Sequence, residues 1–421
     1  MVNRPGRNAL CPCGSGRKYK ACCLPADEAS ERAAQGAFPG HRPPFVDRLE
    51  FDEDLDAADE LDAVWERFTD ADYEEQIATF EDALAARTVD GDSAFEMLSE
   101  IHAEAVARGE RARVRTLLER FARELPTLYA RDAHYYAGWL IDEALATGDV
   151  GRLPALLAPL AEHADEAIGE VLEIARQLAY HGHVAPIVDV MQRGWPAVER
   201  SPDIHPEVRL QYAGLLSDLL VEQYVATAPN SRPDDPALAA QVEPYLDVEE
   251  AAFQQNVAAL LGQLGRSWRA ADFESPPRSE PRGRRLFLLV QEWAGEAWRR
   301  HGVPLSRACL AAELLATYLD EHASKGMRAA RMLVPAPRPL DRFIAEYLDV
   351  LVYDVYRVVA LVELLPLYLE FLVERGLLEP SAARRALAEL RPVQAGLVRE
   401  LEGSEDDAAL LAALGARWPA S

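Results

Sequence analysis

Four of the five cysteines in the chain lie close together near its start, as Cys11, Cys13, Cys22 and Cys23. Thiolates grouped in this way bind soft cations, and zinc in proteins prefers a tetrahedron of four sulfur or nitrogen ligands. In an extended segment, residues two apart point to the same side, so the first two cysteines can reach one ion together. Residues 14–16 include two glycines, which tolerate positive φ and allow the chain to reverse. The spacing therefore favours a zinc site, and metal binding would supply the folding energy of this small segment.

Two other states of these thiols remain open, because four cysteines could also form two disulfides or stay reduced. Disulfides belong to oxidising compartments. Residues 1–10 are polar and basic and lack the apolar stretch of a secretory signal. We therefore expect a cytoplasmic protein in which the cysteines bind Zn²⁺.

Residues 11–23 read Cys-Pro-Cys-Gly-Ser-Gly-Arg-Lys-Tyr-Lys-Ala-Cys-Cys. This run resembles the SEC-C motif, the zinc-binding tail of the preprotein translocase motor ATPases, over residues 8–24. The resemblance implies that the four cysteines are the zinc ligands, and it suggests a ribosome or an export chaperone as the protein partner. The phosphate-binding loop of a motor requires a Gly-Lys pair, and the chain contains no such pair. The resemblance is thus to the metal-binding motif and not to the motor.

The charge of the chain is unevenly distributed. The formal net charge is −26, which disfavours general nucleic-acid binding by most of the surface. Residues 1–25 nevertheless carry five basic residues and no acidic one. We expect Arg17, Lys18 and Lys20 to contact a protein partner, although these charges could instead only compensate the metal centre. A second hypothesis is weak, salt-sensitive binding of nucleic acid by this basic arm.

The rest of the chain is predicted to be all-α. Apolar residues recur at spacings of three and four, as in Val114, Leu117, Leu118 and Phe121. Proline, glycine and acidic residues mark the boundaries between segments. The predicted segments are a zinc knuckle at 1–25, an acidic and proline-rich tether at 26–62, a helical array at 63–225, proline-rich loops around one helix at 226–285, and a C-terminal helical bundle at 286–421.

A weak internal repeat runs through the helical array. Gly109, Gly148 and Gly182 each follow an apolar helical stretch, at spacings of 39 and 34 residues. Such spacings suit stacked helical hairpins of the TPR or HEAT kind, in which each hairpin covers the apolar face of its neighbour. A plain helical bundle is the alternative.

Several local features can be tested against a structure. We expect one helix over 249–268 and another over 340–365, which Pro366 should end or kink. Trp418 either docks on the helical body or belongs to a frayed tail. The most apolar stretch, 348–373, contains charged residues, so no membrane span is expected.

No motif for catalysis stands out. The segment His181-Gly182-His183 is expected to be an exposed turn, and Cys309 lies in an apolar stripe where it would act as a small buried hydrophobe. Acidic residues are too abundant for any one pair to be singled out. We therefore predict a zinc-binding, non-enzymatic interaction protein. An enzyme with a site inside the helical body remains an alternative that no motif supports.

Overall fold

A computed structural model of the protein describes residues 55–227, 231–246, 249–276, 280–323, 327–349, 354–402 and 407–419. All regular secondary structure in these ranges is helical, which confirms the all-α prediction. The residues from Val64 onward form one compact unit. The elements are α2 (Leu55–Thr69), α3 (Tyr73–Ala86), α4 (Gly91–Arg108), α5 (Arg111–Glu124), α6 (Pro126–Thr147), η2 (Val150–Arg152), α7 (Leu153–Leu156), α8 (Ala158–Glu162), α9 (Ile168–His181), α10 (Val184–Arg200), α11 (Pro206–Thr227), α12 (Pro236–Val242), α13 (Glu250–Leu260), α14 (Ala270–Glu274), α15 (Arg282–His301), α16 (Leu305–His322), α17 (Ala329–Met332), α18 (Pro337–Tyr347), α19 (Val355–Glu374), α20 (Pro380–Leu401) and α21 (Ala408–Ala416).

Helices α2 to α6 share a hydrophobic core of their own. Phe80 of α3 and Phe121 of α5 meet edge to face, with ring centroids 6.1 Å apart, an arrangement that aromatic pairs favour. The stripe of Val114, Leu117, Leu118 and Phe121 is the buried face of α5. This face is the one that the spacing of three and four residues predicts.

Helix α6 takes part in two cores because two adjacent faces of the helix are apolar. Tyr136 and Leu140 pack into the N-terminal core, whereas Ala137, Ile141 and Ala144 pack into a larger core that continues to the C-terminal helices. Residues three or four apart lie on the same face of a helix, so each set stays together.

Three glycines end helices where the sequence indicates. Gly109, Gly148 and Gly182 follow α4, α6 and α9 with φ of 71°, 74° and 80°. A residue without Cβ adopts this left-handed conformation without strain. The second predicted hairpin is irregular, because Pro154 and Pro159 each start a short helix after Gly148 and divide the return segment into η2, α7 and α8. A regular helical repeat therefore stays a prediction.

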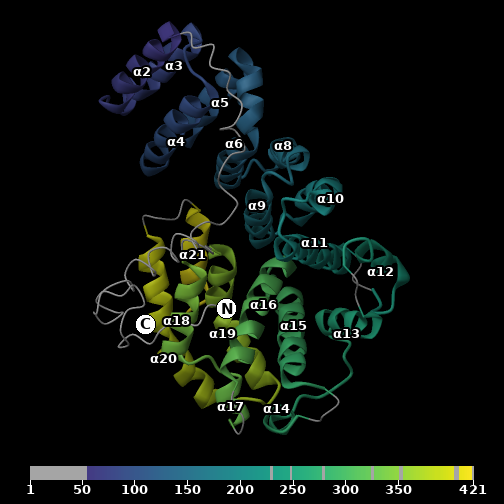
Figure 1. Ribbon diagram of the computed structural model, residues 1–421. Helices are drawn as coiled ribbons and strands as arrows, with labels where there is room; N and C mark the ends of the chain where they lie inside the picture. The colour runs from purple at the N-terminus through teal and green to yellow at the C-terminus, as the bar shows by residue number, and fades with distance from the viewer. Residues whose placement is uncertain are drawn as a thin grey trace, which may run out of the picture. The chain divides into compact units, whose positions relative to one another are not determined.

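Helices α15, α16 and α19 lie side by side in the C-terminal part of the body (Figure 1). Helix α16 packs against α15 and α19 and also contacts α9 and α11. Most side chains of α16 and α19 are buried. A helix that is covered on all sides must be apolar all round, which explains the apolar stretch 348–373. No helix in the described ranges combines the length and the apolar composition that crossing a bilayer requires.

Two expectations about residues 226–285 are wrong. The helix expected over 249–268 is only α13, which ends at Leu260. Gly262 and Gly265 follow with φ of 69° and 64°, so the chain leaves the helical path there. The segment 226–285 was expected to contain one helix, and it contains α12, α13 and α14.

Two further helix boundaries differ from the prediction. The single helix expected over 340–365 is divided, because α18 ends at Tyr347 and α19 begins at Val355. Asp354 is buried at this break and accepts a hydrogen bond of 2.6 Å from Arg357 in the first turn of α19. At the other end of the body, α2 begins at Leu55, inside the segment expected to be a tether.

Pro366 does not end helix α19, which continues through it to Glu374. Proline has no N–H, so the carbonyl of Val362, four residues earlier, lacks its helical donor. The indole Nε1 of Trp418 donates to this carbonyl oxygen at 3.1 Å, and Trp418 is only 8% exposed. Trp418 therefore docks on the body, at the backbone acceptor that the proline leaves free.

Candidate functional site

The predicted metal and partner-binding residues lie outside the described part of the chain. These residues are Cys11, Cys13, Cys22 and Cys23 with Arg17, Lys18 and Lys20. Their roles stay predictions from the sequence. Within the described ranges, no three or more His, Cys, Asp or Glu side chains are grouped so that they could hold a metal ion. The fifth cysteine, Cys309, is a buried free thiol, as its apolar surroundings predict.

A small pocket lies between four helices of the body, α11, α13, α15 and α16. Its volume is about 60 Å³, several times the space that one water molecule needs. One side carries the carboxyls of Asp218 and Glu222 from α11, with Cys309 and Glu313 from α16. The pocket thus gathers three acids and a thiol from two helices that contact each other.

Helix geometry explains why these groups face the same space. Asp218 and Glu222 are four residues apart on α11, and Cys309 and Glu313 are four residues apart on α16. Side chains with this spacing lie one above the other on one face of a helix. Because α11 and α16 pack against each other, each pair is directed to the same gap.

The three carboxyls differ in their contact with solvent. Glu222 is 5% exposed, and its Oε2 has no hydrogen-bond partner among the described residues. Asp218 lines the pocket and is exposed to solvent, and Glu313 is partly exposed. Water can therefore reach Asp218, whereas Glu222 carries a buried oxygen without a partner.

Burial and mutual repulsion make these acids hard to ionise. Burial raises the pKa of Asp218, and the neighbouring Glu313 carboxyl raises it further. Burial also raises the pKa of Glu222, with contributions from Glu313 and Asp218, while a hydrogen bond with Cys309 opposes this shift. The same burial raises the pKa of the Cys309 thiol. The pocket therefore favours protonated acids, or a bound cation that compensates their charge.

Basic side chains beside the pocket are already paired. Arg357 lies 3.9 Å from Glu313 and 2.5 Å from Asp354, and Arg176 lies 3.4 Å from Asp354. They lower the pKa of Glu313 and partly offset the effect of its burial. No basic side chain among the described residues forms an ion pair with Asp218 or Glu222. The α11 side of the pocket is therefore acidic without compensation.

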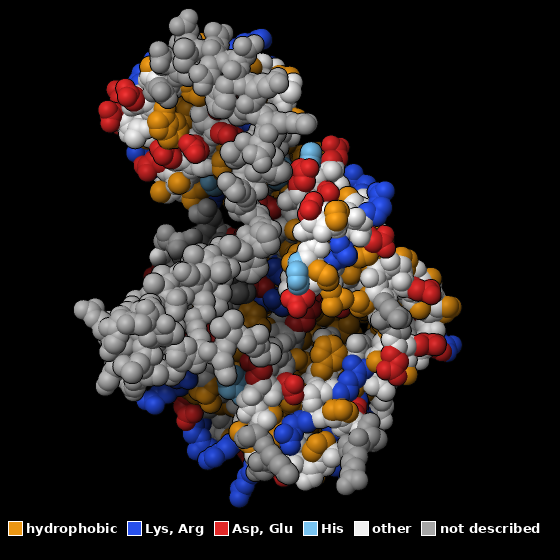
Figure 2. All heavy atoms as spheres, in the orientation of Figure 1, with side chains coloured by type: hydrophobic (Ala, Val, Ile, Leu, Met, Phe, Trp, Pro, Cys, Tyr) orange, Lys and Arg blue, Asp and Glu red, His pale blue; other side chains and the backbone are white. Residues whose placement is uncertain are grey.

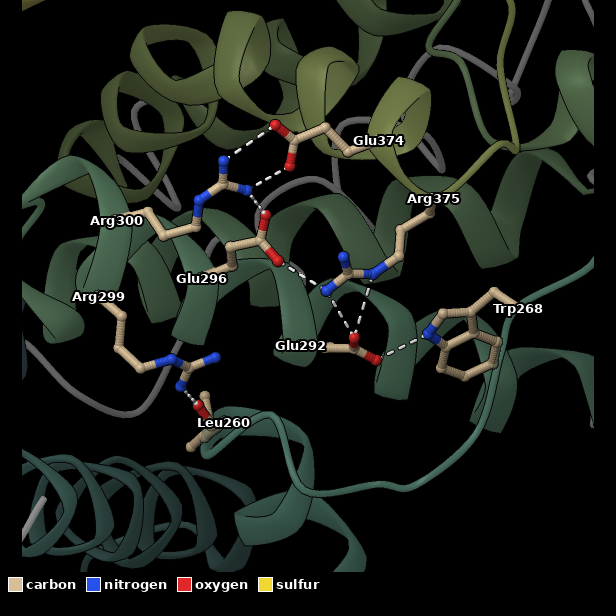
Figure 3. A network of polar contacts seen from close by, with 8 residues as sticks. All are labelled: Leu260, Trp268, Glu292, Glu296, Arg299, Arg300, Glu374 and Arg375. Carbon is tan, nitrogen blue, oxygen red and sulfur yellow. Dashed lines mark hydrogen bonds and ion pairs between the residues drawn. The ribbon is translucent and has the colours of Figure 1, made fainter. Parts of the chain in front are cut away.

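A close approach between α13 and α15 forms one wall of the pocket. Arg299 donates through Nη1 to the carbonyl oxygen of Leu260, the last residue of α13 (Figure 3). A Cβ atom at Gly295 would overlap this carbonyl oxygen, so only glycine allows the contact. Leu260 lines the pocket. The position of this wall thus depends on two residues of α15 that do not touch the pocket.

In contrast to the acids of α11, the acids of α15 belong to a network of hydrogen bonds and ion pairs (Figure 3). Arg375 donates to Glu292 at 2.8 Å and to Glu296 at 2.6 Å. Trp268 donates to the other oxygen of Glu292 at 2.7 Å, and Arg300 bridges Glu296 and Glu374. Each carboxylate has a charged partner, so this network is structural.

Asp218, Glu222 and Glu313 were not among the candidate site residues predicted from the sequence. A signal was present, since Asp218 and Glu222 interrupt an otherwise apolar stretch of α11 at helical spacing. The sequence gives no indication that Glu313, some 90 residues later, faces them. The turn expected at His181-Gly182-His183 is present, with Gly182 exposed, although both histidines are partly buried. His181 Nε2 lies 2.5 Å from Asp407 Oδ2, with 12% of the histidine side chain exposed.

Acidic and basic side chains are interspersed over most of the face of the described residues that Figure 2 shows. Apolar side chains lie between them. A surface that binds the nucleic-acid backbone gathers its basic residues along one face. The face in Figure 2 does not have this character.

Comparison with known proteins gives a match to the N-terminal cysteines. Residues 7–25 match the family model described as the SEC-C motif. The chain carries a SEC-C motif. Over 20 residues it is 85% identical to protein translocase subunit SecA 1 of Chlorobium chlorochromatii (strain CaD3). Over 20 residues it is also 80% identical to a UPF0225 protein of Serratia proteamaculans (strain 568).

These similarities are confined to a small part of each protein. Each covers 5% of this chain, and they cover 2% of the translocase subunit and 13% of the UPF0225 protein. No solved structure matches the chain. The SEC-C motif is a zinc-binding type of motif, and this is the property that the match carries.

Proposed function

We propose that the protein is a zinc-binding, non-enzymatic interaction protein whose SEC-C motif contacts a protein partner. Cys11, Cys13, Cys22 and Cys23 would hold one Zn²⁺ in a tetrahedron of sulfur ligands. The observation that carries this proposal is the match of residues 7–25 to the SEC-C motif. The ion would fix the fold of the segment and keep its basic side chains in place.

The donor set fits zinc in its chemistry. Four thiolates form the S₄ set that zinc accepts in structural sites, where all four positions are taken by protein ligands. Such a closed site leaves no position for a substrate or an activated water. This is why the proposal assigns a structural metal and no catalytic step.

The charge pattern supports a partner-binding role for the motif. Residues 1–25 contain five basic residues and no acid, in a chain with a net charge of −26. Arg17, Lys18 and Lys20 would form a cationic rim around the metal, suited to an acidic surface on the partner. The proposed partner is a component of protein targeting, either an export chaperone or the ribosome. The compartment that fits such a partner is the cytoplasm.

Affinity purification with a matched pair of variants tests the proposal. One variant replaces all four motif cysteines by serine, and the control, Cys309→Ser, replaces the buried cysteine of the helical body. We expect the wild-type chain and the control to recover the same partners and the motif variant to lose them. Recovery of the same partners by the motif variant would refute a motif-dependent interaction.

Nucleic-acid binding by the basic arm is the second candidate, favoured by the absence of acids in residues 1–25. The full-length protein titrated with a single-stranded RNA at about 50 and 200 mM salt distinguishes the two. A few phosphate contacts predict an affinity that falls steeply with salt. The protein-partner proposal predicts no measurable RNA binding at either concentration.

A further inference from the structure

We propose that the pocket between α11, α13, α15 and α16 binds a primary ammonium group carried on a short aliphatic chain. The inference concerns residues of the helical body and is independent of zinc. It rests on two acids of α11 without basic partners, an apolar side that faces them, and a volume that suits this ligand.

The acidic side lacks a cation. Glu222 is 5% exposed and its Oε2 has no hydrogen-bond partner among the described residues. A buried polar atom of this kind is costly unless a ligand or water satisfies it. Asp218 lies four residues earlier on the same face of α11 and is reached by solvent. An ammonium group would donate hydrogen bonds to both carboxylates and offset their repulsion.

The opposite side is apolar, with two amides. Phe253 and Val257 of α13 and Phe287 of α15 line the pocket together with Asn256 and Gln291. Methylene groups next to an ammonium would pack on these side chains, and an aromatic face attracts a nearby cation. The pocket thus has a charged end and an apolar end, as an alkylammonium ion does.

Size and donor geometry select among cations. A pocket of about 60 Å³ accommodates a compact ammonium head and a few methylenes. A guanidinium group is larger and planar, and it favours a fork of two parallel hydrogen bonds to one carboxylate. A metal ion is disfavoured because no described set of three acidic, His or Cys side chains is arranged to hold one.

Charged groups on the surrounding helices leave the acids available. Arg284 of α15 donates to Asn256 at 2.6 Å and to the carbonyl oxygen of Ala252 at 2.8 Å. Arg176 of α9 is paired with Asp354, and Arg357 of α19 is paired with Asp354 and, at 3.9 Å, with Glu313, so the free acids are the two of α11. On α16, Glu313 adds a third carboxyl, and burial raises the pKa of the Cys309 thiol, which favours its neutral form.

Binding should depend on pH. Burial and the neighbouring acids raise the pKa of both Asp218 and Glu222. An ammonium ion favours their ionised forms, so its binding releases protons and its affinity rises with pH. The neutral analogue 1-butanol lacks this linkage, because it carries no charge.

Calorimetric titration of the full chain with n-butylammonium chloride tests the proposal at pH 5.5 and pH 8. The affinity should be higher at pH 8, and 1-butanol should not bind. Glu222→Gln and Asp218→Asn should each weaken the affinity about tenfold or more. The control Glu207→Gln removes an exposed carboxylate of the same helix, 85% exposed, and should leave the affinity unchanged.

The source of the ammonium is decided by two further probes, 1,4-diaminobutane and Nα-acetyl-lysine methylamide. Binding of the lysine derivative with the same loss in Glu222→Gln supports a lysine side chain of a partner, whereas binding of the diamine alone supports a free amine. Circular dichroism and the unfolding temperature show whether each variant is folded. Absence of n-butylammonium binding at pH 8, or equal affinity in Glu222→Gln, Asp218→Asn and Glu207→Gln, overturns the proposal. Neither result bears on the proposal that the SEC-C motif binds zinc, because the pocket contains none of the proposed zinc ligands.

Discussion

Buried glutamates in the same helical body differ in whether basic side chains pair with them. Glu292 and Glu296 on α15 are bound by Arg375, and Glu292 also accepts from Trp268. Glu222 on α11 is equally buried, yet no basic side chain among the described residues pairs with it. The three residues are thus alike in type and burial, and they differ in whether another helix supplies a basic partner.

This difference separates a structural role from a binding role. A buried carboxylate with charged partners contributes to stability only while its partners remain, and removal of one partner is strongly destabilising. A buried carboxylate without charged partners is a cost to the folded state, and in a pocket it is a candidate for binding a ligand. The same substitution should therefore have opposite effects at the two places.

Glutamate-to-glutamine substitution compares the two groups directly. Glu292→Gln leaves the guanidinium of Arg375 with one charged partner fewer, and we expect a loss of about 3 kcal/mol in the free energy of unfolding at pH 7. Glu222→Gln removes an uncompensated acid and should be neutral or stabilising. Urea denaturation measures both. A similar loss in the free energy of unfolding in both variants would contradict the distinction between paired and unpaired glutamates.

Gly295 tests whether the pocket depends on the contact between α13 and α15. A methyl group there would overlap the carbonyl oxygen of Leu260, so Gly295→Ala should displace the end of α13 and cost about 1–3 kcal/mol. Gly138→Ala is the control. Gly138 lies inside α6 with open space at its Cβ position, and alanine there should stabilise by up to about 1 kcal/mol. Equal stability of the two variants would show that the contact is not tight.

Substitution of Trp418 tests whether its indole compensates for the helical hydrogen bond that Pro366 cannot donate. Trp418→Phe removes the hydrogen bond to Val362, with an expected cost of about 1 kcal/mol or more. Pro366→Ala restores a helical N–H for the same carbonyl, so Trp418→Phe should cost less in that background. Thermal unfolding of the four proteins gives the coupling. Strictly additive effects would show that the indole bond and the proline are unrelated.

The pH dependence of Glu222→Gln is the smallest expected effect. Burial raises the pKa of Glu222 in the folded protein above its ordinary value of 4.5. The stability that the protonated acid contributes is fully present below pH 4.5 and is lost as the pH rises through the folded-state pKa. Glutamine does not titrate, so the unfolding temperature of the variant relative to the wild type should increase from pH 4.5 to pH 8. A difference that does not change with pH would contradict an acid of raised pKa.

Features that depend on neighbouring residues could be predicted from the sequence. Gly109, Gly148 and Gly182 end helices as expected, because positive φ is a local requirement that glycine meets. The buried stripe of α5 follows from its spacing of apolar residues. The SEC-C motif, too, has all its cysteines within thirteen residues.

Features that depend on distant residues could not be predicted. Of the two outcomes expected at Pro366, an end of the helix is ruled out, because α19 continues through it. The carbonyl that Pro366 leaves free is taken by Trp418, 52 residues later. The pocket joins Glu222 to Glu313 across two helices that only the fold brings together. Spacing along the chain contains no information about such pairs.

Zinc content per chain tests the central claim, that the SEC-C motif holds a structural metal ion, most directly. Elemental analysis of the purified protein should give one zinc per chain, and the same value for Cys309→Ser. Replacement of Cys11, Cys13, Cys22 and Cys23 by serine should reduce it to zero. A wild-type protein purified without chelator that contains no zinc, or a four-serine variant that keeps it, would contradict the account.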